Sequence, residues 1–276
     1  MADKLITPEL IRQLEVHMAS LNRSVSLVLK RGEHPKREEL IDFLKAITGT
    51  SKKLNFHETD SDTLRSPISF FLETENKNTG IAFSGIPSGH EFTSLILAVL
   101  QAGGGDLKLD QTTAESITKI SEPLDFEIFV SLDCHNCPDV VQSVNKLSLL
   151  NPNISSEMID GGLFQELVKQ KDVQGVPVVF LNGELFSSGR VNMAKILSKL
   201  SPFMTPVSNT ENSAQVIDIA VIGGGPAGIS ASIYAARKGF DVAMIAEELG
   251  GQVAETVGIE NLISVKYTTG KELTVA

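Results

Sequence analysis

The sequence predicts an α/β protein made of several successive units, and three observations predict it. One order of strands and helices runs from residue 25 to 101 and appears again from 126 to 200. The pair Cys134 and Cys137 directly follows a strand of the second copy. A glycine-rich turn at 223–228 directly follows another strand beyond both copies. Alternating strands and helices of this kind are typical of α/β folds.

The composition favours an acidic globular protein with more than one core. Of the 276 residues, 42% are apolar and 21% are charged, which is too hydrophobic for a disordered chain. The net charge of -10 and the scattered Lys and Arg argue against nucleic acid or an anionic membrane as partner. The first residues lack an apolar signal core, and no apolar run approaches the roughly 20 residues that span a bilayer. We therefore expect a cytoplasmic protein, whose two cysteines indicate redox chemistry or metal binding rather than a structural disulfide.

The first copy opens with an amphipathic helix. Thr7 is placed to cap it, Pro8 suits its first turn, and apolar residues follow at helical spacing. The further elements of this copy are strands at 25–29, 54–57, 68–72 and 81–84 and helices at 37–47 and 92–101. Ser88 and Glu91 form the Ser-x-x-Glu pattern of a capping box before the last helix.

The second copy follows a glycine break at 103–105 and a helical stretch at 107–120. Its elements are strands at 126–130, 154–159 and 178–181 and helices at 138–150, 163–169 and 192–200. At a constant offset, Arg31 and His34 of the first copy fall where the second has Cys134 and Cys137, so the first copy has no dithiol. A degenerate duplication fits this match, and chance similarity of short α/β segments is the alternative. We assign 1–105 and 106–200 to the two copies, 201–214 to a polar linker and 215–276 to a third unit.

The segment Cys134-His135-Asn136-Cys137 joins a strand to a helix. The positive end of the helix dipole and its unpaired N–H groups favour a thiolate there. We expect Cys134 to attack a disulfide and Cys137, one turn deeper, to resolve the mixed disulfide. Pro177 stands at the mouth of a later strand, and in thioredoxin-like proteins such a proline is cis and exposes the backbone of residue 176 to an extended peptide. Together these features predict thiol-disulfide exchange on a thioredoxin-like fold.

Other interpretations of the residues around the pair remain open. Cys134, Cys137 and His135 are candidate metal ligands, but zinc needs about four ligands and the sequence has no second Cys-x-x-Cys or His-x-x-x-His, so we assign no metal site. We expect His135 to tune the thiolate. Glu91 closes its helix or, if the two copies face each other across a cleft, lies near the thiols and influences their protonation. The remaining histidines are isolated and are expected at the surface: His17, His34, His57 and His90.

The third unit begins with the pattern of a dinucleotide pyrophosphate site. The turn Gly223-Gly224-Gly225-Pro226-Ala227-Gly228 follows an apolar strand at 216–222 and opens a helix at 229–238. Gly223 permits the turn, Gly225 lets the backbone approach a phosphate, and Gly228 permits close packing. A strand at 241–245 ends just before Glu247, which is placed to accept from ribose hydroxyls. A generic tight turn is the alternative.

This unit is also expected to be incomplete. The chain ends at Ala276, short of the roughly 100 residues that such a domain needs. We therefore expect the beginning of a Rossmann-like domain, with a further strand at 262–265, in a fragment of a longer protein.

Several stretches of the sequence together resemble the F subunit of alkyl hydroperoxide reductase. They are Phe-Val-Ser-Leu-Asp-Cys-His-Asn-Cys-Pro-Asp-Val-Val-Gln, Ile-Asp-Gly-Gly-x-Phe-Gln, Gly-His-Glu-Phe-Thr-Ser-Leu, Gly-Gly-Gln and Ile-Glu-Asn. The resemblance implies tandem thioredoxin-like folds, a linker and the opening of an FAD domain, within a flavoprotein that is a homodimer at full length. It also implies electron flow from NADH to FAD, to a dithiol in the flavin-containing half, to the N-terminal dithiol and finally to a peroxiredoxin.

The resemblance further implies roles for individual residues. Cys134 and Cys137 become the N-terminal dithiol, with Glu91 in a cleft near it. The residues that it assigns to the FAD site are Gly223, Gly225, Gly228, Glu247, Gly251, Gln252 and Asn261. Because the second Cys-x-x-Cys and the NADH site are absent from the sequence, we expect a colourless chain that does not oxidise NADH.

Three functional hypotheses follow. The first is an electron relay of this flavoprotein family that reduces a peroxiredoxin through Cys134. The second is a stand-alone protein-disulfide oxidoreductase, which needs neither the linker nor the glycine-rich turn. The third is a metal-binding module without enzymatic activity.

Overall fold

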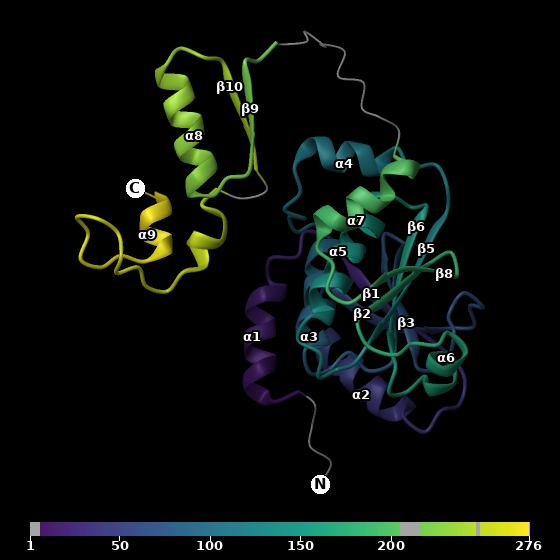
Figure 1. Ribbon diagram of the computed structural model, residues 1–276. Coiled ribbons are helices and arrows are strands. Elements are labelled where there is room, and N and C mark those ends of the chain that lie inside the picture. The colour runs from purple at the N-terminus through teal and green to yellow at the C-terminus, as the bar shows by residue number, and fades with distance from the viewer. Residues whose placement is uncertain (1–5, 205–215, 247–248, 276) are drawn as a thin grey trace. The chain divides into compact units, whose positions relative to one another are not determined.

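The computed structural model describes residues 6–204, 216–246 and 249–275. The chain divides into two compact units, Met1–Val207 and Ser208–Ala276 (Figure 1). Of the predicted linker, Ser201–Phe203 forms the 3-10 helix η1, and residues 205–214 lie outside the described residues. No helix in the described ranges is long and apolar enough to cross a membrane.

An eight-stranded sheet forms the centre of the first unit. Its strands are β1 (Val25–Lys30), β2 (Leu54–Thr59), β3 (Ser69–Thr74), β4 (Lys77–Ser84), β5 (Leu124–Val130), β6 (Ile154–Asp160), β7 (Val178–Leu181) and β8 (Glu184–Ser188). They lie in the order β2-β1-β3-β4-β6-β5-β7-β8, so the four strands of each copy repeat one order. This repetition confirms the tandem thioredoxin-like folds that the sequence predicts. The two copies join edge to edge through parallel pairing of β4 with β6.

Helices flank each copy. Those of the first copy are α1 (Pro8–Met18), α2 (Arg37–Thr48) and α3 (Glu91–Ala102), and those of the second are α4 (Gln111–Thr118), α5 (Cys137–Leu150), α6 (Gln165–Gln170) and α7 (Met193–Leu200). The helix α4 is shorter than the predicted stretch at 107–120 because Asp110 caps it, accepting a hydrogen bond from the backbone N–H of Thr113 at 2.8 Å.

The strand β8 was not predicted, although the sequence carries a signal for it. Asn182 and Gly183 both have positive φ, 51° and 88°, as a two-residue type I′ hairpin requires. Asn-Gly is the preferred sequence of that turn. The hairpin places β8 at the edge of the sheet, where Val178 pairs with Ser188.

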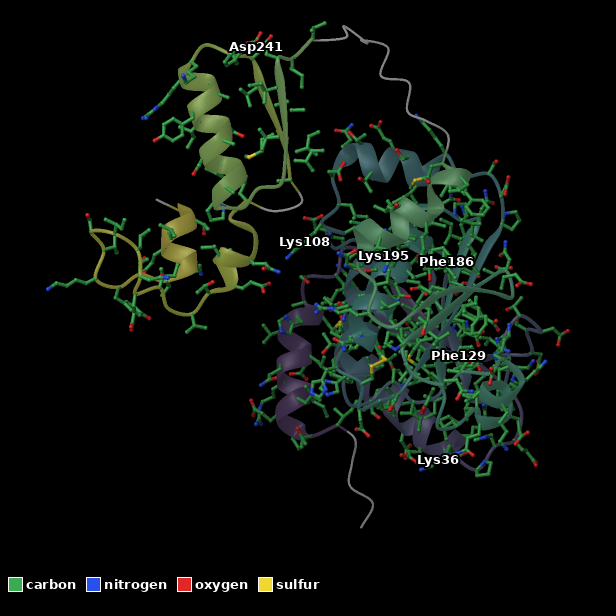
Figure 2. The ribbon with its side chains drawn as sticks, viewed as in Figure 1. Lys36, Lys108, Phe129, Phe186, Lys195 and Asp241 are labelled. Atoms are coloured by element: carbon green, nitrogen blue, oxygen red, sulfur yellow. A yellow bond between two sulfur atoms is a disulfide. The ribbon has the colours of Figure 1, made fainter. Side chains whose placement is uncertain are left out.

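The main core lies between the sheet and one layer of helices. Alternation along β5 turns Phe126 and Ile128 towards this core, which α2, α3, α5 and α7 cover. The side chain of Phe129 faces the other way and packs on Phe180 at 5.7 Å between ring centroids, under α6 (Figure 2). The first copy has no helix between β2 and β3, so its part of that second face is covered by a loop that contributes Leu64.

The second unit contains a pair of parallel strands, β9 (Ile219–Ile222) and β10 (Val242–Ile245). Its helical segments are α8 (Pro226–Arg237), η2 (Gly251–Glu255) and α9 (Gly270–Val275). The apolar run at 216–222 suggested a buried strand, yet Ile222 is 85% exposed, because only β10 and α8 pack on β9 among the described residues. The strand predicted at 262–265 is wrong: Val265 donates its backbone N–H to the oxygen of Leu262 at 3.1 Å and closes a turn.

Candidate redox-active site

Cys134 and Cys137 form a disulfide with their Cα atoms 5.5 Å apart (Figure 2). The helix α5 begins at Cys137, so Cys134 lies in the turn before the helix rather than at its first residue, as the sequence had suggested. The side chain of Cys137 is fully buried, whereas Cys134 is half-buried. The sulfur of Cys134 is therefore the one that an incoming thiol or disulfide can reach.

Pro177 lies beside the disulfide. The Val176–Pro177 peptide bond is cis, as the sequence predicts. The carbonyl oxygen of Val176 lies 3.9 Å from Sγ of Cys134. The chain segment that precedes β7 thus forms one wall of the site, and its backbone lies next to the exposed sulfur.

The equivalent place in the first copy carries different chemistry. Arg31, the counterpart of Cys134, forms an ion pair with Asp60 at the surface. A Cβ atom on Gly32, whose φ is +134°, would lie 2.6 Å from the ring of Pro67, so that proline packs directly against the loop after β1. No thiol stands in this loop, which agrees with the predicted loss of dithiol chemistry from the first copy.

The start of α3 meets the loop that holds the disulfide. The backbone N–H of His90 donates to the carbonyl oxygen of Leu132 at 3.0 Å. The imidazole of His90 lies 4.1 Å from that of His135, measured between ring centroids. Sequence reasoning missed this contact and treated His90 as an isolated surface residue, because nothing local in the sequence pairs residue 90 with residue 135.

Glu91 is buried at the start of α3. The capping hydrogen bond predicted for it is not formed, because His90 is the N-cap residue and both carboxylate oxygens of Glu91 are buried without a hydrogen-bond partner. This burial raises the pKa of Glu91 to about 7. The Ser94 hydroxyl partly offsets the rise, although it does not reach hydrogen-bond geometry with either oxygen. The alternative in which Glu91 lies near the thiols fits the contact between its neighbour His90 and His135.

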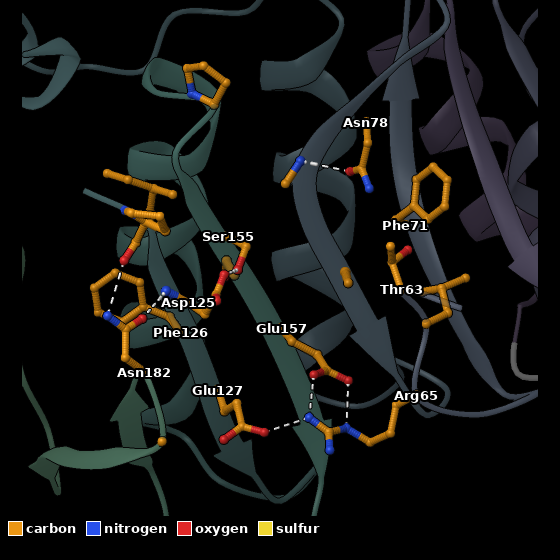
Figure 3. Close-up of a pocket in the computed structure, with 18 residues that line it drawn as sticks. Thr63, Arg65, Phe71, Asn78, Asp125, Phe126, Glu127, Ser155, Glu157 and Asn182 are labelled. Carbon is orange, nitrogen blue, oxygen red and sulfur yellow. Dashed lines mark hydrogen bonds and ion pairs between the residues drawn. The ribbon is translucent and has the colours of Figure 1, made fainter. Parts of the chain in front are cut away.

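A hollow of about 970 Å³ lies on the face of the sheet that α6 only partly covers (Figure 3). Arg65 lies at its edge and donates to Glu127 at 2.6 Å and to Glu157 at 2.7 Å. The hydrogen bond to Glu157 raises the pKa of Arg65. Burial alone would raise the pKa of Glu127, but hydrogen bonds from Lys171 and Arg65 hold it below its usual value. These pairs tie a loop of the first copy to two strands of the second, and none of the predicted site residues lines the hollow.

The glycine-rich turn has the geometry of an anion site. Gly223 has φ +114°, and a Cβ on Gly228 would lie 2.0 Å from the carbonyl oxygen of Gly223. Gly225 is the N-cap residue of α8, and a Cβ there would meet nothing within 4 Å. Pro226 and Ala227 are the first residues of this helix, whose unpaired N–H groups face the open space. The chain therefore fits the pyrophosphate of a dinucleotide at this point.

The remaining predicted cofactor residues are only partly brought together. Gly224 accepts a hydrogen bond from the backbone N–H of Gly250 at 2.7 Å. A Cβ on Gly251 would lie 3.2 Å from Cα of Gly225, so Gly251 and its neighbour Gln252, the first residues of η2, lie beside the turn. Asn261 lies in the loop between η2 and α9, and Glu247 lies outside the described residues.

Comparison with known proteins agrees with this geometry. A family model described as a thioredoxin domain matches residues 124–201, and one described as pyridine nucleotide-disulphide oxidoreductase matches residues 217–270. An "NADH dehydrogenase" of Bacillus subtilis is 42% identical over 95% of this chain and 50% of its own length. The F subunit of alkyl hydroperoxide reductase in Pseudomonas aeruginosa is 41% identical over 98% of this chain and 51% of its own length. The chain thus spans about half the length of the curated relatives it matches.

A solved structure covers the first unit. It is the NTD_N/C domain of alkylhydroperoxide reductase AhpF from Enterococcus faecalis, which is 33% identical, with a TM-score of 0.66. The match covers 71% of this chain and 99% of that one. Both the dithiol-bearing fold and the start of the nucleotide-binding unit agree with this relationship. The chain belongs to the AhpF family, the flavoproteins of alkyl hydroperoxide reductase.

Proposed function

We propose that this chain is the thiol-disulfide relay of a peroxiredoxin reductase, with Cys134 as the residue that attacks the disulfide of the peroxiredoxin. The observation that carries the proposal is the unequal burial of the two sulfurs: Cys134 is accessible beside the carbonyl of Val176, and Cys137 is buried behind it. A dithiol so arranged has one thiol for the partner and one to release it.

The exchange runs in two steps. The thiolate of Cys134 attacks one sulfur of the partner's disulfide, the S–S bond of the partner breaks, and its second sulfur leaves as a thiolate that takes a proton. Cys137 then loses its proton and attacks Sγ of Cys134, which frees the partner's first sulfur as a thiol and forms the Cys134–Cys137 disulfide. Two electrons pass from the chain to the partner.

Residues around the dithiol support these steps. Pro177 holds the backbone of Val176 beside Cys134, where an extended segment of the partner can pair with it. Glu91 influences the protonation of the thiols, since a buried carboxylate disfavours a nearby thiolate and a protonated one does not. Its raised pKa, about 7, places that change near neutral pH.

The source of the electrons is the second part of the proposal. The turn at 223–228, with Gly251, Gln252, Asn261 and Glu247, binds the pyrophosphate and ribose portions of FAD through backbone N–H groups, the α8 dipole and side-chain acceptors. Bound FAD would pass electrons taken from NADH to a dithiol in the flavin-containing half. We infer that the full-length protein is a cytoplasmic homodimer in which the Cys134–Cys137 disulfide receives those electrons.

Electron transfer from the reduced chain tests the proposal. The full chain is reduced with dithiothreitol, freed of it, and mixed with an oxidised peroxiredoxin of the same organism or with insulin. We expect two peroxiredoxin thiols to appear for each chain, much faster than insulin thiols. Equal rates for both disulfides would favour the stand-alone oxidoreductase, and no transfer to the peroxiredoxin would refute the relay.

A further inference from the structure

Two imidazole rings meet beside the disulfide. His135 stands between the two cysteines, and His90 is the N-cap residue of α3, in the copy that has no cysteine. Their ring centroids are 4.1 Å apart and their planes are tilted by 46°. Both side chains are exposed. An exposed pair of rings in contact at a reactive loop is not explained by the packing of the core.

The backbone, not the ring, fixes the position of His90. Its N–H donates to the carbonyl oxygen of Leu132 at 3.0 Å. The preceding residue, Gly89, has φ +55°, and a Cβ there would lie 2.6 Å from the same oxygen. The helices that follow pack side by side, with Gln142 of α5 donating to the hydroxyl of Ser94 of α3 at 3.4 Å. A change of the His90 side chain therefore leaves in place the contact between α3 and the disulfide loop.

We propose that His90 is a positioning residue for the dithiol: its ring holds the imidazole of His135 beside Cys134 and favours the reduced form. A free exposed side chain loses rotamer entropy when it adopts one orientation, and a ring already packed against it lowers that cost. An imidazole kept next to Cys134 stabilises a thiolate by hydrogen bonding or, when protonated, by its charge. The thiolate exists only in the reduced form, so this stabilisation shifts the equilibrium away from the disulfide.

Equilibrium with glutathione measures the effect. Two glutathione thiols give two electrons to the Cys134–Cys137 disulfide and become oxidised glutathione, and their protons pass to the new thiols or, for a thiolate, to solvent. In the full chain, we expect His90→Ala to shift this equilibrium towards the disulfide by about three- to tenfold, where tenfold is about 30 mV for a two-electron couple. The inference rests on the proposed function only in requiring that the disulfide can be reduced.

A double-mutant cycle separates positioning from a general effect on the fold. We expect His90→Ala to have no further effect in a His135→Ala background, because the ring that it positions is gone. His90→Asn, which keeps a good N-cap but has no ring, should behave as His90→Ala, and His90→Phe should stay within about twofold of the wild type. His17→Ala, an exposed histidine change on α1, is the control.

The outcomes are distinct. An unchanged equilibrium in His90→Ala and His90→Asn, or an equal shift with and without His135, would overturn the inference. A disulfide that glutathione cannot reduce in any variant would overturn the proposed function instead.

Discussion

Replacing Glu91 by Gln should change how the stability of the first unit depends on pH. Burial raises the pKa of this carboxyl from 4.5 to about 7, so the folded chain binds the proton more tightly than the unfolded chain. The stability that the protonated group allows is complete below pH 4.5, falls as pH rises, and is lost above about pH 7. At about 1.4 kcal/mol for each pKa unit, the loss amounts to about 3 kcal/mol. The uncharged amide of the variant has no such loss.

Urea unfolding followed by far-ultraviolet circular dichroism, at pH 4.5 to 8, measures this difference. We expect the free energy of unfolding of the wild type to fall by up to about 3 kcal/mol more than that of Glu91→Gln across the range. Glu38→Gln, an exposed change of the same kind on α2, is the control and should follow the wild-type curve. Parallel curves for Glu91→Gln and the wild type would refute the assignment of a buried, unpartnered carboxyl.

Two other substitutions test separate parts of the structure, each against a matched control. Gly228→Ala should expose the second unit to proteolysis, since its Cβ would lie 2.0 Å from a carbonyl oxygen, whereas Gly225→Ala, with open space around it, should be cleaved like the wild type. Equal cleavage of both variants would contradict the packing at the turn. Arg65→Met should lower the free energy of unfolding by about 1–3 kcal/mol because it leaves two half-buried carboxylates without their partner. Arg12→Met, at an exposed ion pair, should have almost no effect, and equal losses in both variants would contradict the role of the Arg65 pairs.

Local patterns were enough to predict the chemistry-bearing residues. A strand, two cysteines and a helix in succession identify the dithiol, and Pro177 before a short apolar strand predicts the cis peptide bond that the structure contains. The glycine-rich turn could be read in the same way, because each glycine answers a local backbone requirement. The repeated order of elements predicted the tandem folds.

Contacts between distant segments could not be predicted. Pairing of β4 with β6 joins the copies through strand edges, and no local pattern names the partner of an edge strand. For the same reason the sequence did not reveal that His90 meets His135, or that Glu91 is buried rather than capping its helix. The strand predicted at 262–265 failed because a short apolar run fits a turn as well as a strand.

Trapping the mixed disulfide tests the central claim most directly. A Cys137→Ser chain, reduced and mixed with oxidised peroxiredoxin, is analysed by non-reducing electrophoresis and peptide mapping. Because the resolving thiol is missing, we expect a stable one-to-one adduct through Cys134, and none with Cys134→Ser. An adduct of the Cys134→Ser chain through Cys137, with none from Cys137→Ser, would contradict the assignment of Cys134 as the attacking residue.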